Sequence, residues 1–195
     1  MGALHQRTRT TATAAPGGSA AAPADERVRA IIDRAEDLAA AGRLHDVATL
    51  LRPALAQLSG HAVTAEALDA AVLYAHALTG TGHPAVAAAW AGWAHPRSHR
   101  HRDHGPGHPT TIRALGVAAA ALLADHRPRQ SAARYRNLVA ALTTTSGPAS
   151  GHTLAARADL ARALHHAGSC ATAHHELANT WHTRRLHAGD TDVLA

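Results

Sequence analysis

Residues 151–177 decide the fold, and they read GHTLAARADLARALHHAGSCATAHHEL. Leu160, Ala161 and Leu164 lie three and four positions apart, which places them on one face of an α-helix. Gly168 interrupts this pattern, and a second helical pattern starts at Cys170. The stretch therefore predicts two helices that are joined by a short turn.

The same pattern recurs along the chain. A shift of about 42 positions places Leu164 on Leu122, and similar shifts place Leu122 on Leu78 and Leu78 on Leu38. The same shifts align further pairs of residues: Leu154 with Ile112, Leu177 with Tyr135, Ile112 with Leu68, Leu68 with Val28, Val117 with Leu73, Pro128 with Pro84, and Gly82 with Gly42. A period of this length with two helices in each unit predicts a helical solenoid, because each hairpin of helices buries its apolar face only against its neighbours.

Four units follow from this alignment. Their first helices are expected at about 26–41, 64–80, 109–124 and 151–167, and their second helices at about 44–58, 84–95, 128–144 and 170–187. Pro84, Pro109 and Pro128 each suit the first turn of a helix, where the missing N–H costs little. We expect residues 1–24 to be a disordered tail, 25–188 the repeat domain, and 189–195 a C-terminal tail.

Composition favours an all-α fold. The chain has no Phe, only 3% aromatic residues, and 46% hydrophobic residues, many of them Ala. Ala is the best helix former and lets helices approach closely, whereas a β-rich chain would carry more β-branched and aromatic residues. The segment 1–24 lacks the apolar run of a secretory signal, and no stretch is long and apolar enough for a membrane span. A cytoplasmic location is therefore expected, which the single cysteine, Cys170, also suits.

Two loops carry a resemblance to a known family. Gly105-Pro106-Gly107-His108-Pro109-Thr110-Thr111-Ile112, and more loosely Gly147-Pro148-Ala149-Ser150-Gly151-His152-Thr153-Leu154, look like the loop before the first helix of a tetratricopeptide repeat unit. They resemble the longer repeats of kinesin light chains and of many actinobacterial proteins. The resemblance implies a right-handed αα-superhelix of about four helix-turn-helix units. The sequence departs from the family pattern in unit three, where His126 replaces the glycine of the turn.

The resemblance further implies a non-enzymatic scaffold, adaptor or regulatory protein that holds a protein or peptide partner on a concave surface lined by the first helices. The implied partner-binding residues are Arg29, Glu36, Asp69, His76, Arg113, Arg162, His165 and His166. A groove lined by Arg and His favours an acidic peptide or a terminal carboxylate, because guanidinium groups bind carboxylates in a two-pronged way. No cofactor is expected, since the chain has no phosphate-cradling glycine loop, nucleophile elbow or zinc-protease motif.

Two alternative functions stay open. The net charge is +5 and every basic residue is Arg, including runs at 100–102 and 127–136 that could contact nucleic acid phosphates. The chain also has 18 His, densest at 95–108, and imidazoles at short spacing can bind zinc or nickel. We interpret 95–108 as a polar loop without a metal site, because the ligand spacing is irregular and Arg97, Arg100 and Arg102 lie among the imidazoles. Trp90 and Trp93 are expected to fill the packing between units.

Overall fold

The computed structural model describes residues 24–58 and 63–192, with the side chains of 24–25, 57–58 and 188–192 left out. The predicted N-terminal tail therefore lies outside the described residues, except for the backbone of Ala24. All regular structure in the described ranges is helical, which confirms the predicted all-α solenoid. The helices are α1 (Ala24–Ala40), α2 (Leu44–Leu58), α3 (Ala65–Gly80), α4 (Pro84–Arg100), α5 (Pro109–Ala124), α6 (Pro128–Ser146), α7 (Gly151–His166) and α8 (Cys170–Asp192).

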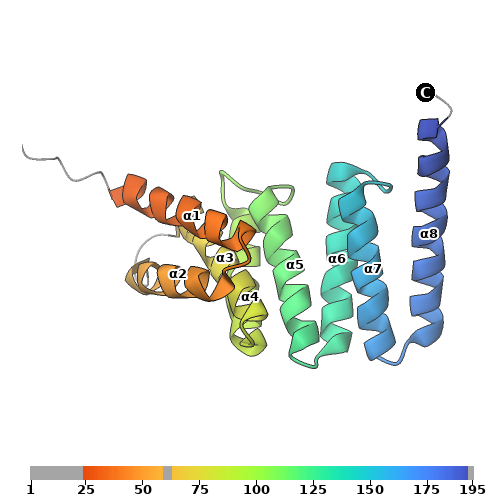
Figure 1. Cartoon of the computed structure of the whole chain (residues 1–195), viewed down its shortest axis with the longest axis horizontal. Coiled ribbons are helices and arrows are strands. Elements are labelled where there is room, and N and C mark those ends of the chain that lie inside the picture. The colour runs from red at the N-terminus through yellow and green to blue at the C-terminus, as the bar shows by residue number, and fades with distance from the viewer. Residues whose placement is uncertain (1–23, 59–62, 193–195) are drawn as a thin grey trace, which may run out of the picture.

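The helices form hairpins that stack along the long axis of the molecule, with α1 at one end and α8 at the other (Figure 1). Each helix packs on the next one in the chain, so that the second helix of one unit contacts the first helix of the following unit. The first helices also pack together, α1 on α3 and α3 on α5, whereas α5 and α7 form no comparable contact in the described chain. The first three units are therefore joined more closely than units three and four.

The turn inside each unit has one repeated structure. The carbonyls of Leu38, Leu78, Leu122 and Leu164 each accept a hydrogen bond of 2.9 Å from the backbone N–H five residues later. This bond closes a helix end in which the preceding residue adopts a left-handed conformation. Gly42, Gly82 and Gly168 fill that position with φ between 72° and 84°, and His126 fills it in unit three with φ 55°. The leucines that the sequence shifts align thus have the same role in all four units.

The loops before α5 and α7 also match each other. The Thr111 hydroxyl donates to the Gly105 carbonyl over 2.8 Å, and the Thr153 hydroxyl donates to the Gly147 carbonyl over the same distance. Both glycines have positive φ, of 80° and 88°, which only glycine adopts without strain. The two loops that resemble each other in sequence therefore have the same backbone structure.

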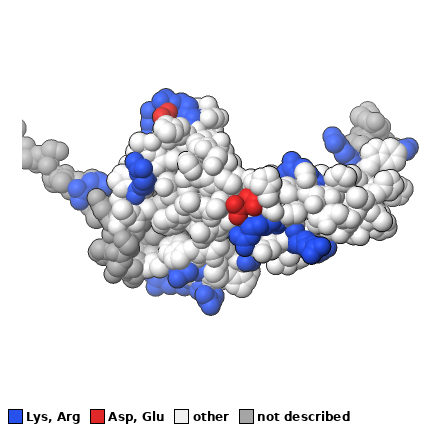
Figure 2. All heavy atoms as spheres, turned by 90° about the horizontal axis from the view of Figure 1, so that it is seen from below, with Lys and Arg blue, Asp and Glu red and all other residues white. Residues whose placement is uncertain are grey.

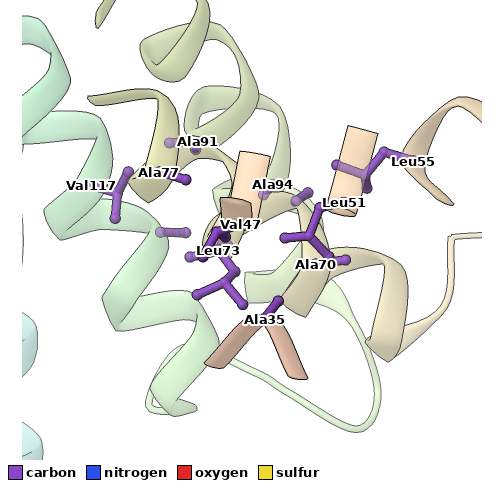
Figure 3. Close-up of a cluster of buried hydrophobic side chains, with 14 of the residues drawn as sticks. Ala35, Val47, Leu51, Leu55, Ala70, Leu73, Ala77, Ala91, Ala94 and Val117 are labelled. Atoms are coloured by element: carbon purple, nitrogen blue, oxygen red, sulfur yellow. The ribbon is translucent and has the colours of Figure 1, made fainter. Parts of the chain in front are cut away.

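The largest part of the core lies among α1 to α5 and is built from Ala, Leu and Val (Figure 3). Val47, Leu51 and Leu68 are fully buried there, and alanines such as Ala35 and Ala91 let the helices approach closely. The alanine-rich composition thus supplies tight helix contacts in place of bulky aromatic packing.

Trp90 and Trp93 fill packing space between units, as predicted. Both are half-buried against the large core, and Tyr74 meets the Trp90 ring edge-on at 5.6 Å.

The predicted boundaries are wrong at two helices. Helix α4 continues through Pro96 to Arg100 instead of ending near 95, so His95 and His99 lie on a helix and not in a polar loop. Ser98, fully buried, holds this last turn through a 2.6 Å hydrogen bond to the Thr111 hydroxyl of α5, a tertiary contact that overrides the proline signal. Helix α8 continues to Asp192, so the predicted tail at 189–195 starts within it.

Within the described residues, none of the helices is long and apolar enough to cross a membrane.

Candidate peptide-binding groove

The first helices of units one to three form a polar groove on their shared surface. One pocket of about 210 Å³ is lined from α1, α3 and α5 by Arg29, Ile32, Asp33, Glu36, Glu66, Asp69, Thr110 and Arg113. A second pocket of about 450 Å³ shares Glu36 and Arg113 with the first and adds Ala39, Leu73 and His76. We call these two pockets together the first-helix groove.

Five of the eight predicted partner-binding residues meet in this groove. Arg29 and Glu36 come from α1, Asp69 and His76 from α3, and Arg113 from α5. They converge because the first helices pack on one another while each turn reverses the chain, so that residues about forty positions apart become neighbours.

Polar contacts link all three helices across the groove. Arg29 of α1 pairs with Glu66 of α3, and the Thr110 hydroxyl of α5 donates to Asp69 of α3. The guanidinium of Arg113, on α5, lies 3.2 Å from the carboxylate of Glu36 on α1. These contacts link the three helices and pair both groove arginines with carboxylates of the protein itself.

The remaining charge in the groove is negative. Four carboxylates, those of Asp33, Glu36, Glu66 and Asp69, line the first pocket against the two guanidiniums. A backbone hydrogen bond at the start of α3 lowers the pKa of Glu66; burial opposes this shift, and the charge of Arg29 adds to it. The exposed carboxylate of Asp33 has no side-chain partner among the described residues. The groove is therefore better suited to a cationic group than to the acidic peptide that the Arg and His residues alone suggested.

His76 does not add positive charge at neutral pH. Burial lowers its pKa below the ordinary value of 6.5, and the charge of Arg113 lowers it further. The imidazole is therefore a neutral hydrogen-bonding group in the second pocket.

The three predicted residues of unit four lie elsewhere. Arg162 pairs with Asp159 of its own helix over 2.8 Å, and His165 Nδ1 lies 3.7 Å from the Sγ of Cys170 at the start of α8. His166 lines a separate pocket at the end of α7 beside Arg127 and Arg129. Because α7 does not pack on α5 as α5 packs on α3, the structure does not join unit four to the groove. The Cys170 side chain is exposed.

Six lining residues of the groove are not among the predicted partner-binding residues, namely Ile32, Asp33, Ala39, Glu66, Leu73 and Thr110. Helical spacing could have found them, because Asp33 lies four positions after Arg29 and three before Glu36, on the same helix face. Glu66 precedes Asp69 by three positions, and Thr110 precedes Arg113 by three. Each missed residue thus shares a face with a residue that was predicted.

The two alternative functions gain no support from the arrangement of side chains. His104 and His108 stack with their ring centroids 4.0 Å apart, yet no group of three or more His, Cys, Asp or Glu in the described part of the chain could hold a metal ion. On the face drawn in Figure 2, Arg gathers in several separate patches and does not form a continuous basic stripe. Arg102 and Arg127 lie within 4 Å of Asp103 and Asp125, at 3.4 and 3.7 Å.

The stacked helix hairpins are the fold of tetratricopeptide-like helical repeats. Among solved structures, the chain is similar to the crystal structure of the nearly identical TPR-like repeats of a putative kinesin light chain from Podosopora anserina. The TM-score is 0.63 at 17% identity, over 86% of this chain and 92% of that one. A crystal structure of a point variant of the same repeats gives a TM-score of 0.43 at 15% identity, over 83% and 96%. No protein-family model matches the chain, and no curated protein does.

Proposed function

We propose that this protein is a non-enzymatic interaction scaffold that holds a peptide segment of a partner protein in the first-helix groove. The observation that carries the proposal is that five residues, which the resemblance to tetratricopeptide repeats implies as partner-binding, converge on two adjoining pockets. The tetratricopeptide-like fold supports a protein-binding role in general. We further propose that the protein is an adaptor or regulatory protein of the cytoplasm.

The peptide we propose is basic. The Asp33 carboxylate lies exposed in a pocket whose volume of about 210 Å³ suits a single long side chain. A Lys or Arg side chain of the partner would meet Asp33 and Glu36 there, while its backbone crosses from α1 toward α5. The acidic peptide suggested by the sequence alone is the competing possibility, and it would have to displace Glu36 from Arg113.

Binding of two labelled peptides tests this proposal directly. Both would be Gly/Ser peptides of equal length, one with spaced Arg residues and one with Glu at the same positions, and affinity would be read by fluorescence polarisation. We expect the Arg peptide to bind, and Asp33→Asn to weaken it about tenfold because a charge-assisted contact is lost. Glu26→Gln is the matched control, since Glu26 is an exposed carboxylate of α1 outside both pockets.

Tighter binding of the Glu peptide would favour the acidic partner instead. If neither peptide bound, or if Glu26→Gln and Asp33→Asn had equal effects, the groove would not be the binding site.

A further inference from the structure

The outward face of α8 differs from that of the other second helices. Helices α2, α4 and α6 are each covered by the first helix of the next unit, namely α3, α5 and α7. Helix α8 packs on α7 with one face, where Ala173 is buried. Leu177 and Trp181 follow Ala173 by four and eight positions, at the edge of this contact, and they are 50% and 59% exposed.

The equivalent positions of α6 are covered by a helix. The repeat shift that places Leu177 on Tyr135 also places Trp181 on Val139. In α6 these positions pack in the core shared with α7, and Tyr135 is only 2% exposed. Helix α8 therefore keeps the large apolar residues of a helix-receiving face, without a covering helix in the described part of the chain.

The other end of the solenoid is closed by charged side chains. The repeat shift places Arg34 and Asp37 of α1 on Ala118 and Ala121 of α5, which are buried. Arg34 and Asp37 are exposed, as is required of a capping helix with a polar outer face. The apolar outer face of α8 is thus particular to that end, and is not a general property of the terminal helices.

The charges beside this face are basic. Exposed Arg184 and Arg185 follow Trp181 on the helix, and the Arg185 guanidinium carbon lies 4.7 Å from the centre of the Trp181 ring. Glu176 is the one carboxylate among the described side chains of α8. Two copies of the chain that paired through α8 would bring four arginines together, and the charged face of α1 offers no apolar partner for Leu177 and Trp181.

We infer that the outward face of α8 docks an amphipathic helix of a partner protein, in the place that α7 takes on α6. The apolar side of that helix covers Leu177 and Trp181, and acidic residues along its edge pair with Arg184 and Arg185. Tryptophan and arginine are the side chains most often found at the energetic centre of protein interfaces, together with tyrosine. This surface is separate from the first-helix groove, so the two sites can be occupied independently.

Two synthetic helical peptides with the same Leu stripe, one flanked by Glu and one by Arg, would test the inference by fluorescence polarisation. The Glu-flanked peptide should bind at least about tenfold more tightly, and Trp181→Ala should weaken it by a similar factor. Arg185→Gln should flatten the dependence of affinity on salt, because screening acts on the charge contacts. Val86→Ala is the matched control, since Val86 is 49% exposed on α4, away from α8.

Several outcomes would overturn the inference. Equal binding of both peptides, or no binding of the Glu-flanked peptide at millimolar concentration, would contradict it. A dimer in sedimentation that Trp181→Ala dissolves would make a second copy the occupant instead of a partner helix. Asp33→Asn should leave this binding unchanged, which separates the test of α8 from the test of the groove. Circular dichroism of each variant would confirm that the helices are intact.

Discussion

Arg113 and Glu36 are 77 positions apart in the sequence, and their side chains form an ion pair of 3.2 Å. The pair joins the first helix of unit three to the first helix of unit one, across α3. It lies in both pockets of the first-helix groove, and the charge of Arg113 adds to the burial that lowers the pKa of His76. The groove is therefore a property of three units acting together.

A double-mutant cycle would measure this link. We expect Glu36→Gln and Arg113→Gln to show a coupling free energy of about 0.2–1 kcal/mol in urea unfolding, because both side chains are half exposed and screened by water. Arg43 and Asp46 form a comparable pair at one turn and serve as the local reference. Zero coupling between Glu36 and Arg113 would contradict the expected contribution of this ion pair to the stability of the protein.

The alanine-rich core depends on its few large side chains. Leu68→Ala should lower the free energy of unfolding by about 2–5 kcal/mol, since Leu68 is fully buried and its removal leaves a cavity. Leu177→Ala should cost less than about 1 kcal/mol because Leu177 is half exposed. Denaturant unfolding of both variants compares them, and similar losses would contradict the described packing.

His126 carries a backbone strain that its counterparts avoid. His126→Gly should raise the free energy of unfolding by up to about 1 kcal/mol, because φ is 55° and glycine adopts that region without a steric penalty. The reciprocal change Gly168→His should lower it by a similar amount, although the space around Gly168 is open. Thermal unfolding of the two variants gives the answer, and a destabilised His126→Gly protein would show that the imidazole itself stabilises the turn.

Acid should weaken the loop between α4 and α5. Burial lowers the pKa of His104 below 6.5, and His108 and His101 lower it further against the opposing charges of Asp69 and Asp103. The unfolded chain thus binds more protons near pH 6, and stability that is present above pH 6.5 is lost as the pH falls. Burial is also the largest cause that lowers the pKa values of His76 and His95.

Unfolding free energies between about pH 8 and pH 5 would reveal this dependence. The His104→Asn variant should show a shallower loss, because the amide can keep the 3.0 Å contact with the Ser98 hydroxyl and does not titrate. An unchanged slope in that variant would exclude His104 as a source of the acid sensitivity.

Truncation after residue 149 should produce an aggregating protein. Removal of α7 and α8 uncovers Tyr135, Leu138 and Leu142 of α6, which are buried in the core shared with α7. Light scattering and unfolding of the purified fragment would show this. A monomeric fragment 1–149 that unfolds cooperatively would contradict the dependence of unit three on unit four.

The sequence by itself determined the repeat, the turns and most helix limits. Leucine, glycine and proline recur at equivalent places, and each acts through local physics: a helix face, a left-handed turn or a helix start. The five groove residues of units one to three follow from the resemblance to tetratricopeptide repeats, which implies a concave surface lined by the first helices. Even the unusual turn at His126 is visible as a gap in the glycine pattern.

Only the tertiary structure decided how the units meet. It joined α5 to α3 but not α7 to α5, and so it separated Arg162, His165 and His166 from the groove. It paired the groove arginines with carboxylates and left negative charge in excess, and it left Leu177 and Trp181 uncovered. Helix packing angles and ion pairs depend on contacts between side chains that are far apart in the chain. A periodic pattern of apolar residues predicts the helices but does not predict these individual contacts.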